Sequence, residues 1–87
     1  MLKIPFIYAD DCDDCKRMKT FLKIATMNSG FECEVIGYNS NTEKAIEIAI
    51  EYGVEDIPAC IIGDKVFFGK NGFTYEAIFE AVKELGE

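Results

Sequence analysis

The sequence has no histidine, no apolar run long enough to cross a membrane, and too few basic residues to form a strongly positive surface. A membrane-spanning helix needs about 18 consecutive apolar residues, and no stretch of the chain approaches that length. Acidic residues outnumber basic ones by 16 to 9, which gives a net charge of −7. Nucleic acids and anionic membranes require a basic footprint, so we expect neither as a partner, and a basic protein surface is the better complement.

The chain has 87 residues and contains no repeat, linker or low-complexity segment, so we expect a single domain over residues 1–87. Its hydrophobic share of 49% is sufficient for one core. The apolar start, MLKIPFIYA, lacks the basic flank and the small-residue cleavage pattern of a targeting segment. We therefore expect a cytoplasmic protein, and we expect it to be a monomer.

The four cysteines stand at positions 12, 15, 33 and 60, so only the first two are close in sequence. A reducing compartment disfavours a disulfide framework. Zinc would need two ligands beyond Cys12 and Cys15, and no histidine is available to supply them. We therefore expect no metal, one functional pair, and two buried thiols, Cys33 and Cys60, that behave as small hydrophobic residues.

The apolar periodicity predicts an α/β protein with the order strand, helix, strand, helix, strand, strand, helix (βαβαββα). The run 2–9 predicts a strand buried on both faces. We expect a break at Pro5, or a start at Phe6, because proline lacks the N–H that a central strand uses. A helix is expected over residues 13–27. Residues 31–36 alternate apolar and acidic side chains, which predicts an edge-like strand.

Ser40 and Glu43 have the spacing of a capping box, which predicts that a second helix begins there. The face of this helix that we expect to be buried consists of Ala45, Ile46, Ala49 and Ile50. Further on, ACII and KVFF predict two short strands joined by a hairpin turn at Gly63. A last helix should begin at Thr74 and end at Gly86.

Cys12 and Cys15 are separated by Asp13 and Asp14 at the predicted junction between the first strand and the first helix. Cysteines at positions i and i+3 of a first helical turn are close enough to form a disulfide. Free N–H groups and the helix dipole stabilise a thiolate at Cys12, and Cys15 should point inward beneath it. This setting indicates thiol–disulfide chemistry; the alternatives are two incidental thiols or half of a zinc site.

Four features together resemble the thioredoxin/glutaredoxin superfamily: the strand–CxxC–helix start, the segment YGVEDIPA, the hairpin IIGDKVFFG and the final helix. YGV-x-x-IPA is similar to the thioredoxin segment that carries a cis-proline. The short length and the hairpin are similar to glutaredoxins and to the small redox proteins of archaea and bacteria. The resemblance covers essentially the whole chain. It implies a thioredoxin fold, with a four-stranded mixed sheet in the order 2-1-3-4 flanked by three helices.

The same resemblance implies a protein disulfide oxidoreductase. Cys12 would be the nucleophile that attacks a substrate disulfide, and Cys15 would resolve the mixed disulfide. The Ile57–Pro58 bond would be cis and lie beside Cys12, with the Ile57 backbone pairing with an extended substrate segment. The resemblance implies no cofactor other than the redox-active Cys12–Cys15 disulfide. The implied partners are a disulfide-containing substrate protein and an electron donor similar to thioredoxin reductase.

The sequence also departs from the family patterns. The Asp-Asp dipeptide is neither the Gly-Pro of thioredoxins nor the Pro-Tyr of glutaredoxins, and Asp11 stands where thioredoxins usually have tryptophan. Phe6 stands about where thioredoxins carry a buried carboxylate. The turn by which glutaredoxins hold the amine of glutathione is replaced by residues 69–73, GKNGF. This replacement argues against glutathione binding.

Four aspartates flank Cys12, and the two basic residues that follow offset their charge only in part. Because negative neighbours oppose the thiolate, we expect the pKa of Cys12 to lie above that of strongly oxidising CxxC proteins, which makes the pair an electron donor. Asp11, Asp13 and Asp14 are also expected to attract basic substrates and to repel glutathione, which is an anion. The alternative is that these acids only solvate a loop and cap a helix.

Two rival functions remain open. A glutaredoxin-like protein would depend on glutathione or bridge an iron–sulfur cluster, and it would then be coloured and contain iron. A non-catalytic interaction module would keep the fold and lack disulfide reductase activity. The intact CxxC and the proline at position 58 disfavour the module, because a site that has lost its activity is expected to have lost one of them.

Overall fold

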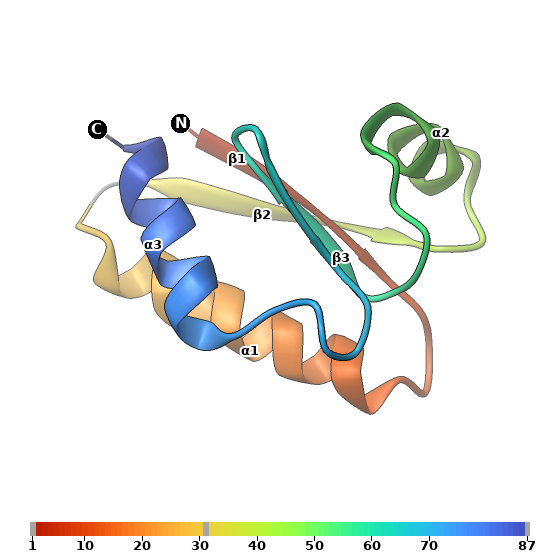
Figure 1. Cartoon of the computed structure of the whole chain (residues 1–87), viewed down its shortest axis with the longest axis horizontal. Helices are drawn as coiled ribbons and strands as arrows, with labels where there is room; N and C mark the ends of the chain where they lie inside the picture. Colours follow the sequence, from red (N-terminus) through yellow and green to blue (C-terminus); the bar gives the residue numbers. More distant parts are fainter. Residues whose placement is uncertain (1, 31, 87) are drawn as a thin grey trace.

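The protein is described from a computed structural model that covers residues 2–30 and 32–86. Its sheet has the strand order β2-β1-β3-β4, and Figure 1 labels the first three of these strands. β1 (Leu2–Tyr8) pairs in parallel with β2 (Cys33–Asn39) and antiparallel with β3 (Ala59–Ile62). β4 (Lys65–Phe68) pairs antiparallel with β3 through a hairpin whose turn residue Gly63 has a φ of 66°. The mixed four-stranded sheet and its predicted order are confirmed.

The helices of the described chain lie on both sides of this sheet (Figure 1). α1 (Asp13–Asn28) and α3 (Tyr75–Leu85) pack against each other on one side, whereas α2 (Glu43–Tyr52) lies near one end of the other side. The N-cap of α3 is Thr74, whose Oγ1 accepts a hydrogen bond from the Ala77 N–H at 3.1 Å. The element order and the start of the last helix therefore agree with the sequence.

Two apolar clusters, one on each side of the sheet, form the core. The larger cluster joins the sheet to α1 and α3, and its fully buried members include Ile4, Met18, Leu22, Ile78 and Val82. The smaller cluster joins the sheet to α2 and consists of Ile7, Ala45, Ile48, Ala59 and Ile61. Cys15 and Cys60 belong to the larger cluster, so the start of α1 is attached to the main core through the second cysteine of the CxxC motif.

The expected break in the first strand is wrong. β1 continues through Pro5, which pairs with Ile36 in the parallel ladder. β3 joins the other edge of β1 at Phe6 and Ile7, so Pro5 lies just before the part of the strand that is paired on both sides. A proline is tolerated there because its missing N–H matters most where a strand hydrogen-bonds on both edges.

The second strand and the start of the second helix lie further along the chain than the sequence predicts. β2 extends to Asn39 because it pairs with every residue of β1, and its place at the edge of the sheet is confirmed. Phe31, the first residue of the predicted strand, lies outside the described residues. The N-cap of α2 is Thr42, whose Oγ1 accepts from the Ala45 N–H at 3.3 Å. The Ser40–Glu43 capping box is therefore wrong.

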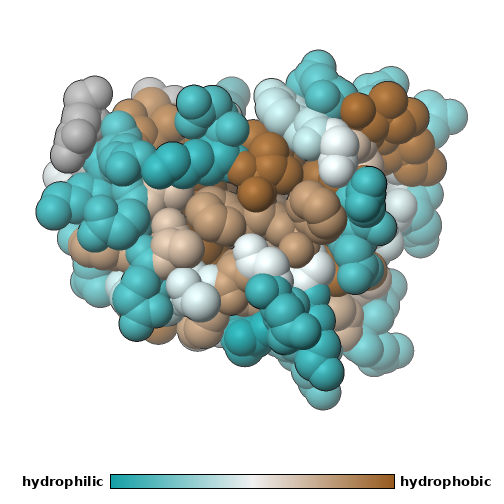
Figure 2. Space-filling view, in the orientation of Figure 1, coloured by the Kyte–Doolittle hydropathy of each residue, from teal (hydrophilic) through white to brown (hydrophobic). Residues whose placement is uncertain are grey.

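The buried face of α2 also differs from the expected one. Ala45 and Ile48 are buried, whereas Ile46 and Ile50 are 51% and 77% exposed. Figure 2 shows strongly hydrophobic side chains gathered on the surface over α2. Ala45, Ile48 and Ala49 share one face of the helix at i, i+3 and i+4, and this face packs on the smaller cluster, so two of the four predicted core positions are on the surface.

Candidate redox-active site

The first turn of α1 positions both cysteines of the CxxC motif. Cys12 is the N-cap residue, with φ −118° and ψ 107°, and its Sγ accepts a hydrogen bond from the Cys15 backbone N–H at 3.1 Å. Asp11 has a φ of 54°, in the left-handed region that aspartate tolerates better than most residues. This residue turns the chain from the end of β1 into α1. The sulfur of Cys12 therefore lies where the free N–H groups of the helix start converge.

Cys12 and Cys15 form a disulfide across this turn, with their Cα atoms 5.2 Å apart. Cys15 is 3% exposed and belongs to the core, whereas Cys12 is only partly buried. Of the two sulfurs, an incoming reactant therefore reaches that of Cys12 first. The two predicted catalytic residues are thus brought together, with one sulfur outward and one inward.

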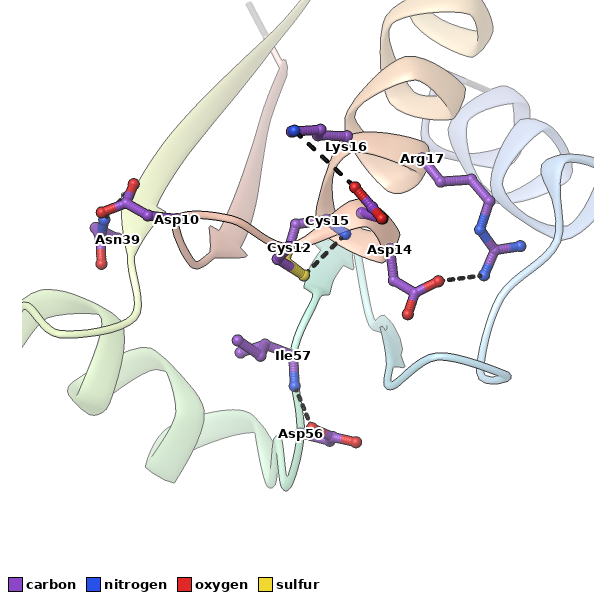
Figure 3. The surroundings of a disulfide bond; sticks show 10 residues. Asp10, Cys12, Asp14, Cys15, Lys16, Arg17, Asn39, Asp56 and Ile57 are labelled. Carbon is purple, nitrogen blue, oxygen red and sulfur yellow. Dashed lines mark hydrogen bonds and ion pairs between the residues drawn. A yellow bond between two sulfur atoms is a disulfide. The ribbon is translucent and has the colours of Figure 1, made fainter.

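The aspartates around Cys12 are held by different partners. Asp13 lies 4.0 Å from Lys16. Asp14 lies 3.5 Å from Arg17 (Figure 3). Asp10 accepts a hydrogen bond from the Asn39 side chain at 3.5 Å. The charges of Asp13 and Asp14 are thus partly offset on the surface of the helix.

The segment before β3 carries Ile57, which lies in the surroundings of the disulfide (Figure 3). The Ile57–Pro58 peptide bond is cis, and Pro58 is buried. Cys12 and Ile57 pack against the same core cluster. The Ile57 N–H, which the sequence assigns to substrate pairing, donates to the Asp56 carboxylate at 2.8 Å (Figure 3). A substrate strand that uses this N–H has to displace Asp56.

The side chain of Arg17 contacts the loop over residues 69–73. Its Nη2 donates to the Lys70 carbonyl at 2.7 Å, and its guanidinium lies 4.4 Å from the centroid of the Phe73 ring. Phe73 is 5% exposed, so it belongs to the core. No local sequence pattern predicts these contacts of Arg17, because a basic residue in a helix normally faces solvent.

The two remaining cysteines do not belong to the disulfide. Cys60 is fully buried, as predicted, and burial raises the pKa of its thiol to about 12. Cys33 is only partly buried, which corrects the expectation of a core thiol. Burial raises the pKa of Cys33, and a hydrogen bond from Ser29 opposes the rise. β1 lies between the strands that carry Cys33 and Cys60, so the two thiols are separated by a strand.

The described residues hold neither a cluster of metal ligands nor a membrane-spanning helix. Over 2–30 and 32–86, no three potential ligands from histidine, cysteine, aspartate and glutamate gather closely enough to hold a metal ion. In the same part of the chain, no helix is both long and apolar enough to cross a membrane.

No protein-family model and no curated protein sequence matches the chain, but several solved structures do. An uncharacterized thioredoxin-like protein from Clostridium perfringens superposes with a TM-score of 0.73 and 22% identity, over 97% of this chain and 70% of that one. The glutaredoxin-like protein NrdH-redoxin from Escherichia coli gives a TM-score of 0.58 and 28% identity, over 91% and 93%. A malarial protein gives 0.61 and 12%, over 94% and 93%.

The first of these structures covers nearly the whole chain and shows the fold alone, because its identity is low. NrdH-redoxin adds a higher identity across almost the full length of both proteins. The architecture is a thioredoxin fold, and the chain belongs to the thioredoxin/glutaredoxin superfamily.

Proposed function

We propose that this protein is a thiol–disulfide oxidoreductase that reduces protein disulfides through the Cys12–Cys15 dithiol. The observation that carries the proposal is the asymmetry of the pair: one sulfur caps a helix at the surface, and the other is 3% exposed beneath it. A nucleophile needs access to the substrate, whereas a resolving thiol needs access only to its neighbour. The geometry fits both requirements.

The reaction begins when the Cys12 thiolate attacks one sulfur of the substrate disulfide. The S–S bond of the substrate breaks, one substrate thiolate leaves, and a mixed disulfide joins Cys12 to the substrate. Cys15 then loses its proton and attacks the Cys12 sulfur, which releases the second substrate thiolate. Two electrons have passed from the dithiol to the substrate, and the Cys12–Cys15 disulfide remains. An electron donor similar to thioredoxin reductase would restore the dithiol.

The start of α1 supports the thiolate of Cys12 in this reaction. The Cys15 N–H already points at the Cys12 sulfur, and a negatively charged sulfur accepts such a bond more strongly than a neutral one. Asp13 and Asp14 act in the opposite sense, because their charges disfavour a second anion nearby. We infer that the balance gives a dithiol that donates electrons more readily than the sites of strong oxidants do.

The substrate is proposed to lie along the cis-proline segment as an extended strand. Pro58 is held in place because its carbonyl accepts a hydrogen bond from the Gly69 N–H at 2.9 Å. The half-buried Ile57 precedes it and would offer its backbone to a substrate strand. The exposed carboxylates of Asp11 and Asp13 favour a substrate with basic residues near its disulfide, and more strongly at low salt.

The loop over residues 69–73 favours this function over glutathione-dependent chemistry. Arg17 donates a hydrogen bond to the Lys70 carbonyl of this loop and lies over the Phe73 ring. In a glutaredoxin the corresponding turn holds the amine of glutathione. NrdH-redoxin is described as a glutaredoxin-like protein with a thioredoxin-like activity profile, and we propose the same combination for this chain. We place it in the cytoplasm, where its two free thiols, Cys33 and Cys60, would stay reduced.

Reduction of insulin in the presence of dithiothreitol tests the proposal. The wild-type protein should accelerate insulin precipitation, and Cys12→Ser should abolish the acceleration. Cys33→Ser is the matched control, because it removes a partly exposed thiol that is not part of the disulfide. A wild-type rate equal to that of dithiothreitol alone would support a non-catalytic module, and robust glutathione-coupled activity would support a glutaredoxin.

A further inference from the structure

A groove of about 650 Å³ lies between α1 and β2, with the Cys12–Cys15 disulfide among the residues that line it. Its volume is in the range of ligand-binding clefts. It is bounded by α1 and the edge strand β2, whereas Ile57 and Pro58 are not among its lining residues. It is therefore a surface distinct from the substrate path along the cis-proline.

The helix side of the groove is basic, although the protein as a whole is acidic. Lys16, Lys19 and Lys23 line it along α1. The first and last of these lysines are seven positions apart in the helix, a rise of about 10 Å. Within residues 2–30 and 32–86, Lys19 and Lys23 form no ion pair, and Lys16 has only the 4.0 Å contact with Asp13. These charges are available to an acidic ligand.

The opposite side of the groove is an edge strand over an apolar floor. Cys33, Val35 and Gly37 line this side, and the stacked rings of Phe6 and Tyr8 contribute to the floor. In the described part of the chain, β2 is paired with β1 and has no strand on its outer edge. A strand with one unpaired edge can accept an extended peptide as an additional strand.

We propose that this groove binds an extended, acidic peptide segment of a partner protein. The helix wall extends from Cys12 to Thr26, which corresponds to about 21 Å, or about six residues of extended chain. A peptide of that length added to β2 places every second side chain on the α1 side of the sheet, where acidic residues meet the lysines. Asp10 and Asp11 line the end near the disulfide and exclude acidic side chains from it.

Peptide binding to a redox-inactive variant, Cys12→Ser/Cys15→Ser, tests this proposal independently of the proposed reaction. The probe is a fluorescein-labelled octapeptide of alternating glutamate and valine. Fluorescence anisotropy at low salt measures its binding. Its counterpart is the same peptide with lysine in place of glutamate. The net charge of −7 by itself favours the lysine peptide. The groove predicts that the glutamate peptide binds more tightly, and the reverse order would overturn the proposal.

Charge reversal localises the binding. Lys19→Glu/Lys23→Glu should weaken binding of the glutamate peptide by about tenfold, given the strength of two exposed ion pairs and their conversion to repulsion. Lys44→Glu/Lys83→Glu makes the same change in net charge at exposed positions of α2 and α3 and should have a much smaller effect. Equal losses in the two variants would contradict a local site.

Backbone amide shifts decide which surface the peptide occupies. Titration of the glutamate peptide should shift the amides of β2 and of α1 between Lys16 and Lys23. Shifts centred on Ile57 would overturn the proposal in favour of the cis-proline path. A second copy of the chain could occupy the groove instead, and sedimentation velocity detects such a dimer. A dimer that blocks peptide binding and persists in Lys19→Glu/Lys23→Glu would also overturn the proposal.

Discussion

The guanidinium of Arg17 lies 4.4 Å from the centroid of the Phe73 ring, and this contact fastens the start of α1 to the loop that precedes α3. The same side chain contacts Asp14 of the CxxC motif at 3.5 Å and donates to the Lys70 carbonyl at 2.7 Å. One arginine therefore links the dipeptide between the cysteines to the loop over residues 69–73. This link adds to the hydrogen bond from Gly69 to Pro58 and to the burial of Phe73 in holding that loop.

Replacement of Arg17 by alanine should lower the free energy of unfolding by about 1–2 kcal/mol, because a cation–π contact and a charged hydrogen bond are lost together. Urea denaturation monitored by circular dichroism measures the change. Lys16→Ala is the matched control, since that lysine has only an exposed 4.0 Å contact with Asp13 and should cost less than about 0.5 kcal/mol. Equal effects of the two substitutions on the free energy of unfolding would contradict a stabilising role for the Arg17 contacts.

Replacement of Asp13 and Asp14 by asparagine should make the cysteine pair more oxidising. Removing two negative charges stabilises the Cys12 thiolate, hence the reduced form, and should raise the reduction potential by about 10–30 mV. Redox titration against dithiothreitol buffers measures the shift. Glu76→Gln/Glu80→Gln makes the same change in net charge on α3 and should leave the potential unchanged. A lower potential in the Asp13/Asp14 variant would reverse the assigned role of these acids.

Replacement of Asp56 by alanine should improve substrate binding. The Asp56 carboxylate accepts the Ile57 N–H at 2.8 Å, and its removal frees that N–H for a substrate strand. One such hydrogen bond corresponds to a change in insulin KM of about two- to tenfold. Glu55→Ala removes the same charge from the neighbouring exposed residue and serves as the control. If both variants behave alike, charge rather than the freed N–H determines the effect.

The buried thiol of Cys60 should make stability fall at alkaline pH. Its pKa is about 12 in the folded protein and 9.0 when it is exposed, so the folded state keeps a proton that the unfolded state has lost. The stabilisation is complete below pH 9 and is lost as the pH rises toward 12, at up to about 1.4 kcal/mol per pH unit. Urea denaturation between pH 9 and 11 should show a shallower decline for Cys60→Ala than for the wild type. Equal slopes would contradict this assignment.

The fold could be predicted because the apolar periodicity and the CxxC and IPA segments point to the same arrangement. Errors arose where tertiary pairing overrode local signals. Gly37 and Asn39 look like turn residues, yet they continue β2 because β1 offers a full-length partner. The same extension moved the helix cap from Ser40 to Thr42.

At the site, local sequence patterns predicted the residues that are close together along the chain. They did not predict contacts between residues that are far apart in the sequence. The spacing of Cys12 and Cys15 within one helical turn was sufficient to place both sulfurs. The contact between Arg17 and Phe73 spans the fold, and no local pattern indicates it. The hydrogen bond from Ile57 to Asp56 was missed as well, although its partners are adjacent in sequence, because aspartate side chains have many local acceptor geometries.

The most direct test of the account is to trap the mixed disulfide on Cys12. Cys15→Ser should form a covalent adduct with a substrate such as insulin, because the resolving thiol is absent, and intact-mass and peptide analysis should place the bond at Cys12. The reciprocal variant, Cys12→Ser, should form no such adduct because Cys15 is buried. An adduct at Cys15 or Cys33, or none with either variant, would contradict the claim that the sulfur at the start of α1 performs the first step.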